Sequence, residues 1–533
     1  MITTKFLMIG ALSVLISGIN LLCDSIQNKE LPKPPIEISL SINNSSAFKV
    51  TPSVYGMATE KISFILNKKQ DDKMTIDFEN QLSPNLLRWP GGGLSTFYHW
   101  NKPGYGYIES EVKSINEKSY QNFIKQDFFN KKNPVTYRYF DKEIELAKRT
   151  KASLIVVANI ITGTPHEFND QLREINKQGV KIKAVELGNE MYLKQARTII
   201  TGPEKYLSIC KPFADSIRKY FPQIPIGICA APFTRIADEE NSSASSNYFK
   251  NWNEVIAKDK WYDFYINHYY IPVQCQDNLN EIGKIFDCAS SDVSELAESF
   301  LSNSFDYYQK IFGTNRKMYI TEWNIAQTMT KGTYGNTLLQ AIFITEFYNT
   351  INKENVKRNN LIEGATYFGM ANGLLASSTI MLPWKNETFR DPIGGDIIRR
   401  TSFYSHILMK KIFNDETKMT SIEIKNNGSK NSNPAISFYS YFNATFNSNW
   451  IYFANKTGNE ISLSEIIVDS KSKKNLTGQF YCLSGPSLYS SFGATKFEYE
   501  YKINEVCKWT EEKIAISNMK IPGYSTGCFE IKN

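Results

Sequence analysis

Hydrophobic positions follow two different patterns along the chain, and the change falls near residue 415. Between residues 54 and 415, short apolar runs alternate with longer segments in which apolar positions recur every three or four residues. The short runs lack strict apolar–polar alternation, which is typical of strands buried on both faces in a parallel sheet covered by helices. Eight such runs begin at Val54, Leu86, Ser153, Ala184, Pro225, Phe264, Met318 and Ala365.

The longer segments between these runs predict amphipathic helices, for example over residues 141–152, 166–179 and 202–221. The second of them reaches Gly179, a residue type suited to the end of a helix. Strands that alternate with helices eight times predict an α/β fold of the (β/α)8 TIM-barrel type, which we assign to residues 51–415.

The remainder of the chain predicts a second domain made of strands. After residue 415 the helical periodicity stops, and short strand patterns separated by turn residues predict a C-terminal β-sandwich over 416–533. An N-terminal segment, residues 26–50, contains the run IEISLSI, which we expect to add an edge strand to this sandwich. The expected sandwich strands are 435–442, 450–457, 478–484, 496–502 and 527–531.

The first residues have the layout of an export signal. Lys5 is followed by an apolar run from Phe6 to Cys23 and then by polar residues, which predicts a signal peptide over residues 1–25. We therefore expect a secreted or extracellular protein. Two alternatives remain open, because the run is long enough for an uncleaved membrane anchor and Cys23 is a candidate lipid-modified N-terminus. Either alternative would attach the protein to the cell surface.

Composition and charge exclude several kinds of partner. The chain has 61 basic and 54 acidic residues, a net charge of +7, with no concentrated basic patch, so we expect no nucleic-acid partner. Only four His are present, and neither a CxxC pair nor an HExxH motif occurs, so the sequence predicts no metal site and no cofactor. The charge is compatible with an acidic polysaccharide substrate but does not indicate one.

Cysteines give a weaker expectation about disulfides. Cys275 and Cys288 would close a short loop in an exported protein. Seven cysteines follow Cys23, and an odd number leaves at least one free thiol, for which Cys210 and Cys229 are the candidates. We also expect one pair among the last three, Cys482, Cys507 and Cys528.

Two glutamates close predicted barrel strands. Glu190 ends the fourth apolar run and Glu322 lies in the seventh. Barrel enzymes carry their chemistry at the C-terminal ends of the strands, so both carboxyl groups are expected to converge over the barrel mouth. Such a pair suits glycoside hydrolysis, with one group as acid/base and the other as nucleophile, and a separation of about 5 Å means retention of configuration. The acid/base needs a pKa raised by burial or by the other carboxylate. An ordinary salt bridge explains either glutamate alone but not both together.

The motifs around these glutamates resemble a known family. Asn-Glu at the end of the fourth strand and Glu on the seventh resemble the retaining glycoside hydrolases of clan A. More narrowly, LRWPGG (87–92), NIITGT (159–164), LGNEM (187–191) and TEWN (321–324) are similar to family 51 α-L-arabinofuranosidases, which also combine a barrel with a C-terminal β-sandwich. ELGNE also resembles family 79, the heparanase and β-glucuronidase relatives. The residues before TGT, where a Gly is more usual, and the insertion over 94–140 depart from family 51.

The resemblance implies roles for three residues, and the alternation of side chains along the predicted strands adds further candidate residues. By resemblance, Glu190 is the general acid/base, Glu322 is the nucleophile, and Asn189 hydrogen-bonds the sugar 2-hydroxyl. From strand phase, Arg88 is expected to reach inward and keep Glu322 ionised. Further candidate substrate-binding residues at strand ends or on loops are His268, Tyr270, Asn159, Trp323 and Trp384, whereas Glu186 is expected to lie deeper as a structural group.

Three functions fit these observations. The first is a secreted retaining glycosidase that cleaves a polysaccharide or its side chains and most resembles an α-L-arabinofuranosidase. The second is a heparanase-like or β-glucuronidase-like hydrolase of acidic glycans, whose activity would depend strongly on salt. The third is a catalytically inactive surface protein that binds carbohydrate. All three have a carbohydrate partner.

Overall fold

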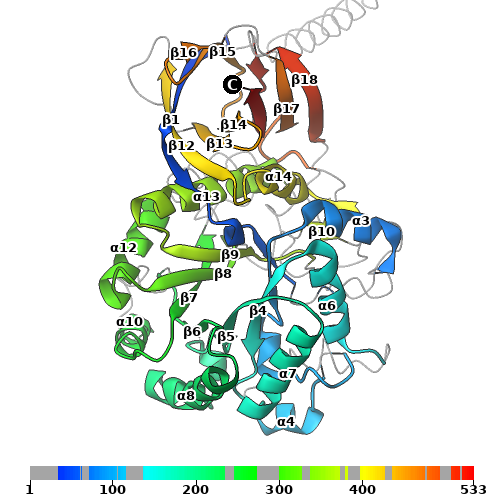
Figure 1. Ribbon diagram of the computed structural model, residues 1–533, viewed down its shortest axis with the longest axis vertical. Helices are drawn as coiled ribbons and strands as arrows, with labels where there is room; N and C mark the ends of the chain where they lie inside the picture. The colour runs from blue at the N-terminus through cyan, green and yellow to red at the C-terminus, as the bar shows by residue number, and fades with distance from the viewer. Residues whose placement is uncertain are drawn as a thin grey trace, which may run out of the picture.

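The structure is a computed structural model with two parts, a barrel surrounded by helices and a curled sheet that packs on one side of it (Figure 1). The residues it describes are 34–59, 62, 71–104, 106–115, 136–233, 245–272, 299–326, 337–371, 379–381, 397–426, 435–473, 477–491, 506–515 and 519–532.

The barrel is closed and consists of eight parallel strands in sequence order. Each of the eight apolar runs overlaps one of these strands, so the predicted TIM barrel is confirmed. The strands are β2 (Gly56–Ala58), β3 (Leu86–Trp89), β4 (Ser153–Ala158), β5 (Ile182–Leu187), β6 (Ile226–Cys229), β7 (Phe264–Pro272), β8 (Lys317–Ala326) and β9 (Ile362–Tyr367).

Helices cover the outer face of the barrel, and the three predicted examples correspond to α6, α7 and α8. Helix α7 begins where the Thr164 hydroxyl accepts a hydrogen bond from the Glu167 amide, 3.2 Å away. It ends just before Gly179, whose φ of +77° stops the helix. The helices are α3 (Lys73–Leu82), α4 (Glu109–Ser114), α6 (Tyr139–Thr150), α7 (Pro165–Lys177), α8 (Pro203–Tyr220), α10 (Ser245–Ile256), α12 (Leu301–Phe312), α13 (Leu338–Lys357) and α14 (Thr401–Lys410).

The second part is a ten-stranded mixed sheet that curls around its own apolar core. The N-terminal strand β1 (Ile36–Lys49) belongs to it, but lies between β12 and β15 rather than at an edge. The predicted strand over 496–502 lies outside the described residues. The other strands are β12 (Thr417–Asn426), β13 (Ile436–Asn443), β14 (Ser448–Asn455), β15 (Ile461–Val468), β16 (Lys471–Ser472), β17 (Thr477–Ser484), β18 (Lys508–Ala515), β19 (Lys520–Ile521) and β20 (Ser525–Lys532), while β10 (Ile380–Met381) and β11 (Ile398–Arg399) form a separate pair.

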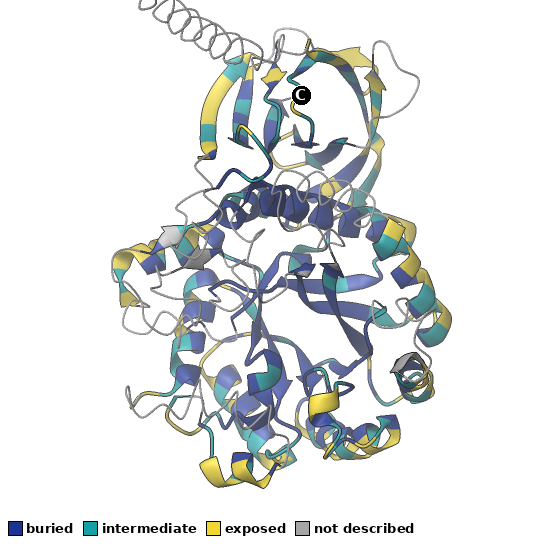
Figure 2. Cartoon of the chain, turned by 180° about the vertical axis from the view of Figure 1, so that it is seen from behind, coloured by how far each residue is buried: buried dark blue, intermediate teal, exposed yellow. Residues whose placement is uncertain are grey.

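Helix α13 joins the two parts and is buried along most of its length (Figure 2). Its Glu346 accepts hydrogen bonds from Lys456 Nζ, 2.9 Å away, and from the Tyr439 hydroxyl, both in the sheet domain. Burial raises the pKa of Glu346, but the Lys456 ammonium outweighs burial and holds that pKa below its ordinary value. A buried ion pair therefore fixes the sheet domain to the barrel.

The structure tests the expectations about disulfides and about a membrane-spanning segment only in part. Cys482, Cys507 and Cys528 are buried free thiols, so the predicted pair among them is wrong. Cys210 and Cys229 are also free, whereas Cys275 and Cys288 lie outside the described residues. Within the described ranges, no helix is long and apolar enough to span a membrane. The predicted signal segment precedes those ranges.

Candidate active site

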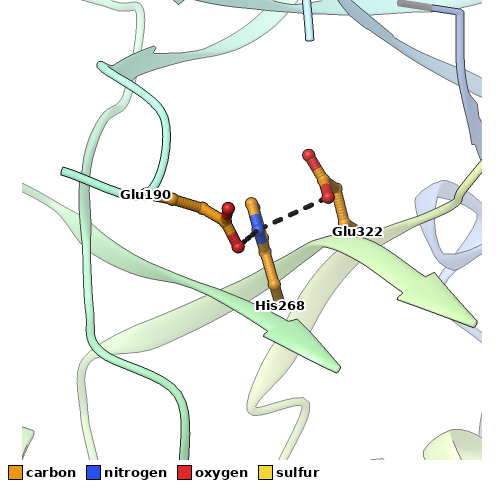
Figure 3. A group of neighbouring side chains, drawn as sticks. All are labelled: Glu190, His268 and Glu322. Atoms are coloured by element: carbon orange, nitrogen blue, oxygen red, sulfur yellow. Dashed lines mark hydrogen bonds and ion pairs between the residues drawn. The ribbon is translucent and has the colours of Figure 1, made fainter. Parts of the chain in front are cut away.

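Four barrel strands bring polar side chains to one place at the C-terminal end of the barrel. Strand β3 contributes Arg88, the turn after β5 contributes Glu190, β7 contributes His268 and Tyr270, and β8 contributes Glu322. In Figure 3 the His268 ring lies between the two glutamates, and dashed lines join it to both. The expected convergence of two carboxyl groups over the barrel mouth therefore occurs.

The two carboxyl groups are close together. An oxygen of Glu190, an oxygen of Glu322 and a ring nitrogen of His268 all lie within 4.8 Å of one another. Retaining glycosidases place their carboxyl groups about 5–5.5 Å apart, whereas inverting enzymes leave about 6.5–9.5 Å for a water molecule. An upper limit of 4.8 Å between these two oxygens is compatible with the shorter, retaining spacing.

Glu322 is held by a donor on each of its oxygens. Arg88 Nη1 donates to Oε1 across 2.7 Å, and the Tyr270 hydroxyl donates to Oε2 across 2.5 Å. Its side chain is only 6% exposed. Two charge-assisted hydrogen bonds in a nearly dry site fix the rotamer and stabilise the anion, which is the form a nucleophile needs.

Glu190 is held by one oxygen only. Its Oε1 accepts from His268 Nδ1, 3.0 Å away, and from the Tyr192 hydroxyl, 3.2 Å away. Its side chain is 26% exposed, much more than that of Glu322. Glu190 therefore faces the open side of the barrel mouth, and its Oε2 is the oxygen without a hydrogen bond from His268 or Tyr192.

The turn that carries Glu190 needs a glycine at position 188. Gly188 has a φ of +80°, and a Cβ there would lie 2.8 Å from side-chain atoms of Ile160 and Met191. Glu190 itself has a φ of +49°, which is uncommon for a residue with a side chain. Residues held in such conformations cluster at functional sites, because packing must compensate for the strain.

The protonation of Glu190 differs from the sequence-based expectation. Burial raises its pKa, but the hydrogen bond and positive charge of His268 outweigh burial and lower it. Burial lowers the pKa of His268, but Glu322 and Glu190 outweigh burial and raise it. These directions favour a proton on His268 over one on Glu190, whereas the expected acid/base would have a raised pKa. The difference arises because the alternation of side chains along the predicted strand placed His268 near the glutamates but did not show that its ring would lie between the two carboxylates.

Below these groups lies a buried ion pair. Arg88 makes two hydrogen bonds of 2.8 Å to Glu186, and its Nη2 also donates to Asn189 Oδ1 across 2.7 Å. Burial opposes the charge of Arg88, but Glu186 and Glu322 raise its pKa above the ordinary value. Glu186 is fully buried, as expected for a residue one layer deeper in the barrel.

Two predicted substrate-binding residues, Asn159 and Trp323, are not part of this group. Asn159 makes hydrogen bonds with its own loop, because its oxygen accepts from two amides and its nitrogen donates to Thr162. Trp323 is fully buried and stacks on Phe347 with ring centroids 4.0 Å apart. It follows the inward-facing Glu322, so strand alternation turns it outward toward α13, and it is not placed to stack on a sugar. Trp384 lies outside the described residues.

Two residues of the site were not anticipated. Tyr192 donates to Glu190, and the Thr321 hydroxyl lies 3.1 Å from His268 Nε2. Strand pairing skips Thr321, since Asn267 pairs with Ile320 and His268 pairs with Glu322. A bulge of this kind leaves no signal in the sequence, and Tyr192 lies in a turn whose direction is equally unreadable.

The same side chains are of the types that bind metals. Glu190, His268 and Glu322 form the only such group among the residues that the structure describes. However, Arg88 and Tyr270 already donate to both oxygens of Glu322, and a cation there would compete with them. The donors suit a carboxylate that reacts or exchanges protons better than one that serves as a metal ligand.

Comparisons with known proteins agree with this architecture. No protein-family model matches the chain, and no curated protein is similar to it in sequence. Among solved structures, the GH51 arabinofuranosidase from Xanthomonas axonopodis pv. citri has a TM-score of 0.64 at 11% identity, covering 93% of this chain and 100% of that one. The α-L-arabinofuranosidase from Thermotoga maritima gives 0.64 at 14% identity, with the same coverage. A Paenibacillus polymyxa xyloglucanase of family 44 gives 0.55 at 11% identity, again covering 93% and 100%. The chain therefore has the fold of the clan A glycoside hydrolases that its motifs resemble, and that of family 51 among them.

Proposed function

We propose that the protein is a secreted retaining glycoside hydrolase that removes α-L-arabinofuranosyl groups from a polysaccharide. The observation that carries the proposal is the pair of carboxyl groups from the turn after β5 and from β8, with oxygens within 4.8 Å of each other and different donors on each. The arabinofuranosyl specificity is supported by the likeness to solved arabinofuranosidases and by the four sequence motifs. The signal segment predicted over residues 1–25 supports secretion.

In the first step, Glu322 attacks the anomeric carbon while Glu190 protonates the oxygen of the leaving group. A covalent glycosyl ester forms on Glu322, and the aglycone departs with the proton. In the second step, ionised Glu190 removes a proton from water, which attacks the same carbon and releases the sugar with retained configuration. Asn189 is positioned beside this centre by Arg88 and would bind the sugar 2-hydroxyl.

The acid proton is supplied by His268. In the free protein the raised pKa of His268 and the lowered pKa of Glu190 favour that proton on the imidazole, whose Nδ1 lies 3.0 Å from Glu190 Oε1. Substrate would cover the exposed part of Glu190, and loss of water disfavours the charged form of a carboxylate. The proton then moves from His268 to Glu190, so the acid forms only when the site is filled.

A panel of aryl glycosides tests the proposal. The purified protein is expected to hydrolyse an aryl α-L-arabinofuranoside, and Glu322→Gln is expected to abolish turnover while the variant still folds. No turnover of arabinofuranosides, xylosides, glucosides or glucuronides by the wild type would refute the enzyme proposal and favour a carbohydrate-binding protein. Preferential, salt-sensitive cleavage of glucuronides would instead favour the hydrolase of acidic glycans.

A further inference from the structure

Arg88 distributes its N–H groups among three partners. Nε and Nη2 face the two oxygens of Glu186, each across 2.8 Å, so the carboxylate occupies one whole edge of the guanidinium. The other Nη2 hydrogen is directed at Asn189, and Nη1 is directed at Glu322. Four of the five donors of the guanidinium are thereby assigned. Arg88 and Glu186 are both fully buried, so water does not replace any of these partners.

This distribution is not the one that Arg88 and Glu322 would adopt alone. An isolated Arg–carboxylate pair favours two parallel hydrogen bonds, with both carboxylate oxygens engaged. Here Glu322 receives a single N–H from Arg88, and its second oxygen is left to Tyr270. The Nη1–Nη2 edge that could give Glu322 a second bond has its Nη2 hydrogen on Asn189, and Glu186 keeps the guanidinium in this orientation by holding the Nε–Nη2 edge.

We propose that Glu186 is a positioning residue, which holds Arg88 so that one guanidinium orients both the nucleophile and the residue that binds the sugar 2-hydroxyl. The inference rests on the proposed function, because it takes Glu322 as the nucleophile and Asn189 as the sugar ligand. Glu186 touches neither the substrate nor Glu322 and acts only through Arg88.

Charge gives Glu186 a second effect on the nucleophile. The Arg88 cation lies between two carboxylates, so its charge is shared between Glu186 and Glu322. Without the Glu186 charge, the cation would stabilise ionised Glu322 more strongly, because buried charges interact across a low dielectric. A more stabilised carboxylate is a poorer nucleophile, and the loss of one negative charge from the buried cluster favours the deprotonated form of the site as a whole.

Glu186→Gln removes the charge and replaces one acceptor oxygen with an amide that faces an Arg88 N–H. We expect kcat on an aryl α-L-arabinofuranoside to fall about 10²-fold, the usual effect of a small misplacement in an active site. We also expect the acidic limb of the pH–rate profile to move to lower pH. Glu186→Asp keeps the charge but shortens the side chain, so its kcat should fall while its acidic limb stays at the wild-type pH.

Glu346→Gln is the matched control, because Glu346 is also a buried carboxylate in an ion pair but lies at the domain interface. Its melting temperature should fall with no change in kcat or in the acidic limb. Wild-type kcat and an unshifted limb in Glu186→Gln would overturn the proposal. If Glu186→Gln does not fold, a wild-type kcat in folded Glu186→Asp would overturn it equally.

A crystal structure of Glu186→Gln separates this inference from the proposed function. We expect Arg88 to turn, engage Glu322 through two N–H groups and lose its contact with Asn189. An unmoved guanidinium would overturn the positioning role, whatever the activity. If the wild type hydrolyses no glycoside, the proposed function fails, and the same crystal structure still decides whether Glu186 positions Arg88.

Discussion

The hydroxyl of Tyr270 offers a direct test of how the nucleophile is held. Tyr270→Phe removes one oxygen and keeps the ring, which packs edge-on against Phe368 with centroids 6.0 Å apart. The lost hydrogen bond spans 2.5 Å to Glu322 Oε2 and joins a hydroxyl to a charged group. Hydrogen bonds to charged groups contribute about 1.5–3 kcal/mol, so kcat/KM is expected to fall roughly 10- to 150-fold.

The neighbouring residue on the same strand supplies the control. Tyr269 points to the other face of β7, where its hydroxyl contacts Ser304 on α12 and no carboxylate. Tyr269→Phe therefore removes a buried tyrosine hydroxyl of the same strand without touching the site. Initial rates on an aryl arabinofuranoside should separate the two variants, with Tyr269→Phe close to wild type. Equal losses in both variants would refute the proposed contact between Tyr270 and Glu322, since they would show a general effect on the strand.

Three further predictions concern the acid, the pH dependence of stability and the domain interface. Glu190→Ala should lose far more activity on glycosides with poor leaving groups than with good ones, which need little acid; equal losses in a kinetic comparison would contradict its role. Burial raises the pKa of Glu143 from 4.5 to about 8, so the folded protein binds the proton more tightly than the unfolded one and stability falls as pH rises from 4.5 to 8. The neutral variant Glu143→Gln should therefore have a free energy of unfolding that rises relative to wild type by up to about 5 kcal/mol across that range, as measured by urea unfolding. A difference that does not change with pH would contradict the raised pKa of Glu143. Lys456→Met leaves Glu346 buried without its cation and should lower the free energy of unfolding by about 3–5 kcal/mol. The double variant Lys456→Met/Glu346→Gln should lose less stability, and a larger loss in the double variant would contradict the ion pair.

Features that depend on local pattern were predictable from the sequence. All eight barrel strands were identified, because buried parallel strands form short apolar runs that helices separate. Convergence of Glu190 and Glu322 followed from strand order alone, since the C-terminal ends of all barrel strands lie at one face. Trp323 was misplaced because its position at the mouth was inferred from proximity in sequence to Glu322, whereas strand alternation turns it outward.

Features that depend on contacts between distant segments were not predictable. Strand β1 lies within the sheet because it pairs with β12 and β15, hundreds of residues away, and no local pattern specifies those partners. The pairing of Arg88 with Glu186 also joins different strands, so the sequence indicated only that Glu186 would be buried. The lowered pKa of Glu190 depends on a hydrogen bond from the His268 ring. The alternation of side chains along a strand does not fix the position of that ring closely enough to predict the bond.

The central claim is that Glu322 forms a covalent bond with the sugar. Wild-type protein incubated with an activated 2-fluoro-arabinofuranosyl reagent and digested should yield one modified peptide, with the added mass on Glu322 by tandem mass spectrometry. Glu190→Ala should still be labelled by a reagent with a good leaving group, because that reagent needs little acid assistance. A label on any other residue, or turnover with inverted configuration and no label, would contradict the account.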